Sequence, residues 1–321
     1  MTSAKMKLTA RNPEDVLAMV PVVLGFTPRD SIVMLTFGAP QAFHARVDLP
    51  PGPSDVPEVV RALVGPAVRH GVRRVLLVGY SDDLPLVDLV IAELEDAFGR
   101  EGVEVVTTLA ADGSRWWALP CDPGSTGVLY DVSSHPFAAQ AVLSGMVTHG
   151  SRDALAATLA SDPDGVAALT RALARLPTPV RPDQRVAEAA WAVGLVRRSV
   201  AEASRPGTGA LARLLVGLQD PTLRDAAWLS LNRADASAHI EFWGHVVRRT
   251  PTPFLAAPAA ILGFAAWLAG HGALAWCAVD RSREADPHDG LAALLAQALS
   301  EALPPSAWDS KSGEPWSGRP A

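Results

Sequence analysis

Cysteine is scarce in this chain: Cys121 and Cys277 are the only two among 321 residues, and they lie far apart in the sequence. That usage excludes a disulfide framework and a Cys-x-x-Cys motif, and it predicts a reducing, cytoplasmic setting. The His-Glu-x-x-His and calcium-loop spacings are also missing. We therefore expect no metal and no other cofactor.

Long runs of one charge are missing too. The 28 basic and 34 acidic residues give a formal net charge of −6 without any block of like sign. This pattern argues against a nucleic-acid partner and against a basic membrane-binding patch. The uncharged stretch between Arg249 and His271 contains three prolines and much alanine, so it predicts a buried helix and not a membrane span.

What the chain does have is a change of pattern along its length. Short alternating runs typical of strands fill residues 31–130, and Ala-, Leu- and Trp-rich helical stretches fill most of the rest. A chain of this length favours two domains, and three closely spaced prolines mark the boundary at Pro177, Pro179 and Pro182. The sequence predicts an α/β domain with a mixed sheet over residues 1–178. A helical bundle or short tetratricopeptide-like solenoid follows over 182–303, and then a flexible tail over 304–321 in which Trp308 is an anchor.

The N-terminal half predicts an α/β sheet. A first helix begins after Asn12 and ends near Pro21. Strands are expected at 31–37, 42–49, 74–79, 103–109 and 114–119, and helices at 55–70 and 84–99. The strand–helix–strand order over 74–109 predicts two parallel neighbours, and the strand at 114–119 predicts an antiparallel one. The sheet is therefore mixed.

Ligands of open α/β sheets bind beyond the carboxyl ends of the strands. Here that rule selects Asp82 and Asp83, which follow the strand at 74–79, and the loop that begins at Cys121. Each has a structural alternative, since Asp before a helix is a common cap.

Alternation in the strand at 42–49 puts His44, Arg46 and Asp48 on one face and its apolar residues on the other. A catalytic His44 oriented by Asp48 is conceivable there, since both side chains point the same way. However, His44 and Asp48 are too far apart along a strand to touch, so a solvated or ion-paired face is the favoured alternative. The predicted ligand-binding residues are Arg46, Asp48, Asp82, Asp83 and Cys121.

The C-terminal half predicts helices separated by Pro or Gly signals. The runs are 186–203, 208–218, 221–233, 236–248, 255–269, 272–285 and 289–302. Two Gly-x-Gly-x-x-Ala segments, at Gly207 and Gly270, lack the preceding strand that a dinucleotide loop needs, so they predict turns between helices. The tryptophans are expected to pack between helices, with a groove lined by them as the alternative: Trp191, Trp228, Trp243, Trp267 and Trp276.

Several short sequence segments are informative when they are taken together. They are Pro21-Val-Val-Leu-Gly-Phe-Thr-Pro-Arg-Asp-Ser-Ile-Val, Arg46-Val-Asp-Leu-Pro, Arg115-Trp-Trp-Ala-Leu-Pro-Cys, Gly150-Ser-Arg-Asp-Ala-Leu, Gly272-Ala-Leu-Ala-Trp-Cys-Ala-Val-Asp and Ala285-Asp-Pro. Together they resemble an actinobacterial family known as domain of unknown function 4192, over nearly the whole chain. The resemblance implies no activity. Members often carry further cysteines after the equivalent of Cys121, where this chain has Asp122-Pro-Gly-Ser-Thr-Gly, so it implies no metal or redox role there.

The leading hypothesis is a cytoplasmic, non-catalytic binding or regulatory protein whose helical domain docks a protein partner. The alternative is an enzyme or sensor with a small-ligand pocket at the strand ends of the α/β domain. The sequence identifies no catalytic residue, no particular partner and no oligomeric state.

Overall fold

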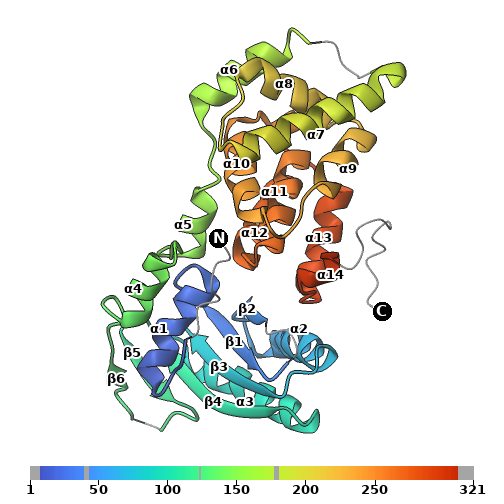
Figure 1. The fold of residues 1–321 in the computed structure, drawn as a ribbon. Coiled ribbons are helices and arrows are strands. Elements are labelled where there is room, and N and C mark those ends of the chain that lie inside the picture. Colours follow the sequence, from blue (N-terminus) through green and yellow to red (C-terminus); the bar gives the residue numbers. More distant parts are fainter. Residues whose placement is uncertain (1–7, 40–42, 123, 177–180, 310–321) are drawn as a thin grey trace. The chain divides into compact units, whose positions relative to one another are not determined.

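The computed structural model describes residues 8–39, 43–122, 124–176 and 181–309 (Figure 1). It divides into two compact units, Met1–Ala154 and Leu155–Ala321. The first, here the sheet unit, contains a mixed six-stranded sheet with helices. The second, the helical unit, is all helical. This is the fold class that the sequence predicts.

The sheet unit contains the predicted strands with nearly the expected bounds. Its elements are α1 (Pro13–Leu24), β1 (Ser31–Phe37), β2 (His44–Asp48), the short 3-10 turn η1 (Pro53–Asp55), α2 (Val56–Arg69), β3 (Arg74–Tyr80), α3 (Leu84–Arg100), β4 (Glu104–Ala111), β5 (Arg115–Ala118), β6 (Val128–Leu129) and α4 (Pro136–Leu143). The short helix α5 (Arg152–Ala157) spans the division between the two units. The sequence pattern does not predict β6 or α4.

The strand order is β2-β1-β3-β4-β5-β6. Strands β3 and β4 are parallel, as expected for two strands joined by a helix, and the other neighbouring pairs are antiparallel. The mixed sheet is thus confirmed.

Apolar residues cover both faces of this sheet. Helices α2 and α3 pack on one face and α1 on the other (Figure 1). Side chains alternate between the faces, so Phe43, Ala45 and Val47 pack with the α2/α3 cluster, as predicted for β2. The neighbouring tryptophans lie on opposite faces: Trp117 joins the α2/α3 cluster and Trp116 the α1 cluster.

Helix α1 corrects one prediction. It was expected to end near Pro21, but it continues to Leu24 and closes with Gly25, whose φ of 81° is left-handed and whose amide donates to the Pro21 carbonyl oxygen. A proline inside a helix removes one hydrogen bond. Burial of Val20 and Val22 around it favours continuing the helix.

The helical unit contains α6 (Pro163–Leu173), η2 (Pro182–Gln184), α7 (Arg185–Ala201), α8 (Thr208–Gly217), α9 (Pro221–Leu229), α10 (Ala236–Arg249), η3 (Thr252–Phe254), α11 (Ala256–Leu268), α12 (Gly272–Ala285), α13 (Gly290–Ser300) and α14 (Ser306–Asp309). Each predicted helical run is present. Gly207 and Gly270 lie in connections between helices, as expected.

Helix α11 forms the centre of this unit. It packs against α10, α12 and α13, and 12 of its 13 residues are buried. A Cβ on Gly263 would come within 2.8 Å of Leu295 Cδ2 and 3.2 Å of the Ala275 carbonyl oxygen. The small residue therefore allows the close approach of α12 and α13. No helix within the described ranges is long and apolar enough to cross a membrane.

Aromatic side chains fill the gaps between these helices. Trp228, Trp243 and Trp267 are buried, and Trp191 and Trp276 are half-buried. Trp308 contacts the rings of Trp228 and Phe264 and donates to the Leu231 carbonyl oxygen at 3.0 Å. It anchors the first part of the predicted tail, and residues 310–321 lie outside the described ones.

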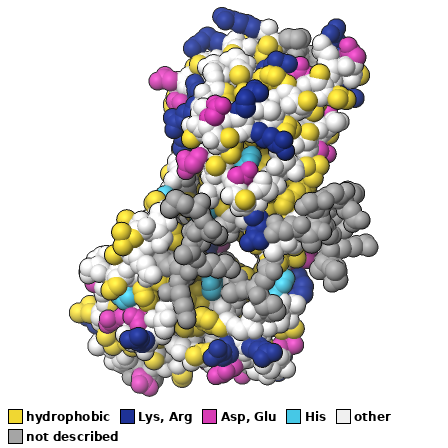
Figure 2. Space-filling view, in the orientation of Figure 1, with side chains coloured by type: hydrophobic (Ala, Val, Ile, Leu, Met, Phe, Trp, Pro, Cys, Tyr) yellow, Lys and Arg dark blue, Asp and Glu magenta, His cyan; other side chains and the backbone are white. Residues whose placement is uncertain are grey.

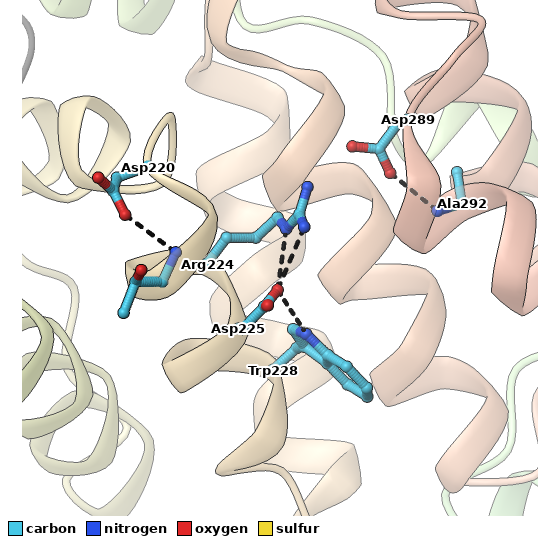
Figure 3. A network of polar contacts seen from close by, with 7 residues as sticks. Asp220, Arg224, Asp225, Trp228, Asp289 and Ala292 are labelled. Atoms are coloured by element: carbon cyan, nitrogen blue, oxygen red, sulfur yellow. Dashed lines mark hydrogen bonds and ion pairs between the residues drawn. The ribbon is translucent and has the colours of Figure 1, made fainter. Parts of the chain in front are cut away.

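Helix α9 shows how polar contacts hold one of these aromatic rings (Figure 3). Asp220 caps the helix by accepting from the Thr222 amide at 2.9 Å. One turn later, Asp225 Oδ1 accepts from Trp228 Nε1 and from Arg224, each at 3.2 Å. The indole is thereby hydrogen-bonded at its edge while the ring is buried, which is the usual requirement for a core tryptophan.

The division between the units lies before the proline cluster expected to mark it. Helix α6 packs against α8 and α10, and the Asp162 amide donates to the Arg248 carbonyl oxygen at 2.6 Å. These contacts group α6 with the helical unit. Pro177 and Pro179 lie outside the described residues, and Pro182 begins η2. Domains that fold independently, divided near Pro179, stay a prediction.

Candidate functional site

One row of paired residues crosses the sheet at the carboxyl ends of β3 and β4. Asp48 pairs with Ser31, Ser31 with Tyr80, Tyr80 with Ala111, and Ala111 with Trp116. Paired residues on neighbouring strands point to the same face. Tyr80 and Ala111 belong to the α1 cluster, so this strand-end row lies on the α1 face of the sheet.

Arg46 and Asp48 contact each other on that face. Arg46 Nη1 lies 2.5 Å from Asp48 Oδ1, and Nη2 donates to the Arg29 carbonyl oxygen at 3.1 Å. The Arg46 side chain is largely buried, whereas the Asp48 side chain is 83% exposed. The ion-paired surface that the sequence left as an alternative is therefore present, and the hydrogen bond to Arg29 holds the guanidinium near the start of β1.

Asp82 and Asp83 follow β3 at the same edge but have different surroundings. Asp83 caps α3, because its Oδ1 accepts from the Leu86 amide at 3.1 Å. Ser81 Oγ donates to Asp30 Oδ1 at 3.0 Å and accepts from the Asp83 amide at 3.2 Å. Asp82 is exposed, and within the described residues its side chain has no hydrogen bond or ion pair. Asp83 thus has a structural role, and Asp82 is available.

Cys121 lies on the other face of the sheet. It packs at the margin of the α2/α3 cluster, and its amide donates to Asp88 Oδ1 at 3.4 Å. Burial, together with the charges of Asp88 and Asp122, raises the pKa of the Cys121 thiol. A raised pKa disfavours the thiolate, which is the nucleophilic and metal-binding form. The fold thus brings Arg46, Asp48, Asp82 and Asp83 to one edge and sets Cys121 apart. Cys277 is buried in α12.

Four enclosed polar atoms on the α1 face have no hydrogen-bond partner within the described chain. They are Ser31 Oγ, Tyr80 OH, Trp116 Nε1 and Arg46 Nε. Three belong to the strand-end row, and Arg46 is two residues before its end on β2. Enclosed polar groups are normally paired, and leaving one unpaired costs about 1–3 kcal/mol. This set is the most unusual polar feature of the sheet unit.

Charges near the row favour protonated phenols. Burial and the neighbouring Tyr130 raise the pKa of Tyr80, and burial and Asp112 raise that of Tyr130. Burial would raise the pKa of Asp112 as well, but hydrogen bonds from Ser114 and Arg115 outweigh it and lower that pKa. Tyr80 therefore keeps its proton and can donate it in a hydrogen bond.

These residues supply hydrogen-bond donors, and no catalytic pair is seen among them. Arg46 Nε and Trp116 Nε1 are donors only, and the Ser31 and Tyr80 hydroxyls can also donate. No group of three or more His, Cys, Asp or Glu residues able to hold a metal occurs in the described part of the chain. The chemistry that this edge supports is recognition of an acceptor-rich group.

A second polar cluster, in the helical unit, is one that the sequence analysis missed. It lines a hollow of about 270 Å³ between the end of α7, the turn after α9 and the start of α10. His239 is 2% exposed, and its Nε2 lies 3.6 Å from Asp235 Oδ1. The spacing of four between Asp235 and His239 was available as a signal, because such residues share a helix face.

A family profile described as "Domain of unknown function (DUF4192)" matches residues 13–306. The chain belongs to this family. The DUF4192 match runs through both the sheet unit and the helical unit, and the family description assigns no activity to either. No curated protein and no solved structure matches the chain significantly.

Proposed function

We propose that the protein is a non-catalytic binding or regulatory protein whose helical unit docks a partner protein. The observation that carries this proposal is the surface of α7. Only three of its 17 residues are buried, in contrast to the enclosed α11. Val186, in the first turn of α7, is 83% exposed.

Further along α7, and on α8, an aromatic and a charged side chain are held in fixed positions. The guanidinium carbon of Arg213 lies 4.0 Å from the centroid of the half-buried Trp191 ring. Arg213 also donates two hydrogen bonds to Glu188, at 2.9 and 2.8 Å. Tryptophan and arginine are enriched among the residues that dominate binding energy in protein interfaces. Holding them in place before binding lowers the entropic cost of association.

The charge distribution supports a protein partner over a nucleic acid. Basic and acidic side chains are interspersed on the visible face of both units (Figure 2), whereas nucleic-acid binding favours a continuous basic surface. A cytoplasmic location is part of the proposal, and the presence of only two cysteines, far apart in the sequence, supports it.

Affinity capture with variants tests this function. The full chain is used to capture proteins from native lysate, together with Val186→Asp and a matched control, Val106→Asp, which replaces an exposed valine of β4 in the sheet unit. We expect a protein retained by the wild type and by the control and lost with Val186→Asp. The same set retained by all three would contradict docking on α7.

A second candidate function is a sensor with a small-ligand site at the strand ends. The four unpaired atoms of Ser31, Tyr80, Trp116 and Arg46 favour it, because all of them can donate and one carries a positive charge. An anionic ligand with several acceptor oxygens suits that set.

A thermal-shift screen of carboxylates, phosphates and nucleotides on the full chain tests the sensor. A ligand of this site should stabilise the wild type and lose its effect in Arg46→Ala. Stabilisation that survives Arg46→Ala combined with Asp82→Ala would exclude the site.

A further inference from the structure

The hollow in the helical unit is built from three elements. Arg197, Val200 and Ala201 come from α7, Ser230 and Asn232 from the turn after α9, and Asp235, Ala238 and His239 from the start of α10. Its volume of about 270 Å³ equals that of roughly nine water molecules in the liquid. A small organic molecule therefore fits.

The wall formed by α10 carries two hydrogen-bonding atoms that lack a partner. Asp235 Oδ1 and His239 Nδ1 are enclosed and make no hydrogen bond within the described residues. The other oxygen of Asp235, Oδ2, accepts from Asn232 Nδ2 at 3.0 Å and fixes the carboxylate. Burial lowers the pKa of His239, and the charge of Asp235 opposes this only in part. The imidazole is thus neutral near pH 7, with Nε2–H turned toward Asp235 and Nδ1 as an acceptor.

The wall formed by α7 carries the opposite charge. Arg197 is exposed and lines the hollow, and within the described residues it makes no ion pair or hydrogen bond. In particular, no ion pair joins Arg197 to Asp235 in the described part of the chain. A guanidinium binds a carboxylate through paired N–H donors, so Arg197 is available for an anionic group of a ligand. Val200, Ala201 and Ala238 add apolar surface.

We propose that this hollow binds a small amine–carboxylate zwitterion of the aliphatic α-amino acid class. The ligand carboxylate pairs with Arg197. Its ammonium group, which has three donors, pairs with the Asp235 carboxylate on the opposite wall, where Asp235 and His239 line the hollow. The aliphatic side chain lies against the apolar residues. This inference goes beyond partner docking on α7 and does not depend on it.

The test is calorimetric titration of the full chain with L-valine and with two analogues of it. Isovalerate lacks the amine, and isobutylamine lacks the carboxylate. We expect L-valine to bind at least about tenfold more tightly than either analogue, since each lacks one charged contact. Arg197→Gln should weaken the binding of L-valine and leave the affinity for isobutylamine unchanged. Asp235→Asn should weaken the binding of L-valine and leave the affinity for isovalerate unchanged.

Arg198→Gln is the matched control, because Arg198 is an exposed neighbour on α7 that does not line the hollow. It should leave all three affinities unchanged. If Asp235→Asn does not fold, the Arg197→Gln comparison decides alone. The proposal is overturned if L-valine, L-leucine and L-alanine do not bind, if the analogues bind as tightly as L-valine, or if Arg197→Gln and Arg198→Gln behave alike.

Discussion

The core of the sheet unit is a six-stranded sheet with an apolar cluster on each face. The core of the helical unit, by contrast, is a single buried helix, α11. In the sheet unit the interior consists mainly of Val, Leu and Ile, which suit a pleated surface. In the helical unit small residues such as Ala and Gly263 let helices approach, and aromatic rings fill the remaining space.

The two interiors also leave polar atoms unpaired in different places. In the sheet unit these atoms belong to residues of the strand-end row and to the nearby Arg46, all on one face of the sheet. In the helical unit Asp235 and His239 border a hollow. The comparison indicates that each unit has its own candidate for recognition, where enclosed polar atoms without partners lie close together. In the helical unit Trp243 Nε1 and Arg281 Nε also lack partners within the described chain, and they do not line the hollow.

The largest expected effect tests whether the two interiors are energetically separate. Phe264 is 1% exposed, and its ring centroid lies 4.8–5.3 Å from those of Trp228, Trp267 and Trp308. Phe264→Ala should cost the helical unit about 3–5 kcal/mol through lost contacts and a cavity. In differential scanning calorimetry, the transition of the sheet unit should stay in place.

Phe98→Ala is the matched change in the sheet unit, because Phe98 is fully buried against α2 and α3 neighbours. Phe98→Ala should lower the melting temperature of the sheet unit and leave the transition of the helical unit in place. A single transition that both variants lower equally would show that the units unfold together and would contradict separate domains.

A smaller effect concerns the approach of α12 and α13 to α11. Gly263→Val should destabilise the helical unit by about 1–3 kcal/mol, because the added atoms meet Leu295 and the Ala275 carbonyl. Gly244→Ala in α10 is the control, since a Cβ there meets nothing within 4 Å. It should stabilise by about 0.5–1 kcal/mol through helix propensity. Urea unfolding measures both, and equal effects would contradict close packing at Gly263.

Removing the Tyr80 hydroxyl should have a still smaller effect, of opposite sign. Because this buried hydroxyl has no partner in the described chain, Tyr80→Phe should raise the free energy of unfolding of the unliganded protein by about 1 kcal/mol. Urea denaturation checks the sign. A loss of stability would mean that the hydroxyl is hydrogen-bonded in solution and would remove the main support for a strand-end ligand site.

The smallest expected effect is a pH dependence of the helical unit. Burial lowers the pKa of His239 in the folded state, partly opposed by Asp235, whereas an unfolded histidine titrates near about 6.5. Below that value the unfolded state binds more protons, so the stability contributed by neutral His239 is complete above about pH 6.5 and decreases on acidification toward the lowered pKa. Melting curves of wild type and His239→Gln at both ends of this window should differ in slope. An identical pH dependence of the wild type and His239→Gln would contradict a lowered pKa of His239 in the folded state.

Local patterns in the sequence were enough to predict most strands and helices of both units. The clean alternation in β2 and the Pro- and Gly-bounded helical runs predicted the strands and α7 to α13, because each is set by its own residues. Strand β6 has two residues, and its pairing depends on the register of β5, so no local pattern reveals it. Helix α1 passes Pro21 because of burial against the sheet, which is a tertiary effect.

The candidate sites were less predictable. The rule for strand ends located Arg46, Asp48, Asp82 and Asp83 at one edge, but Ser31 and Tyr80 become neighbours through the pairing of β1 with β3, which are not consecutive strands. The spacing of four residues is enough to predict that Asp235 and His239 share one face of a helix. Their enclosure depends on the packing of α7 against α10, which local sequence does not encode.

Hydrogen–deuterium exchange of the full chain, alone and with a captured partner, tests the central claim most directly. If the helical unit docks the partner, amides of α7 (Arg185–Ala201) and of the adjoining part of α8 should exchange more slowly in the complex. The strand-end residues 29–31 and 80–83 should be unchanged. Protection confined to those strand ends, with α7 unaffected, would contradict partner docking on the helical unit.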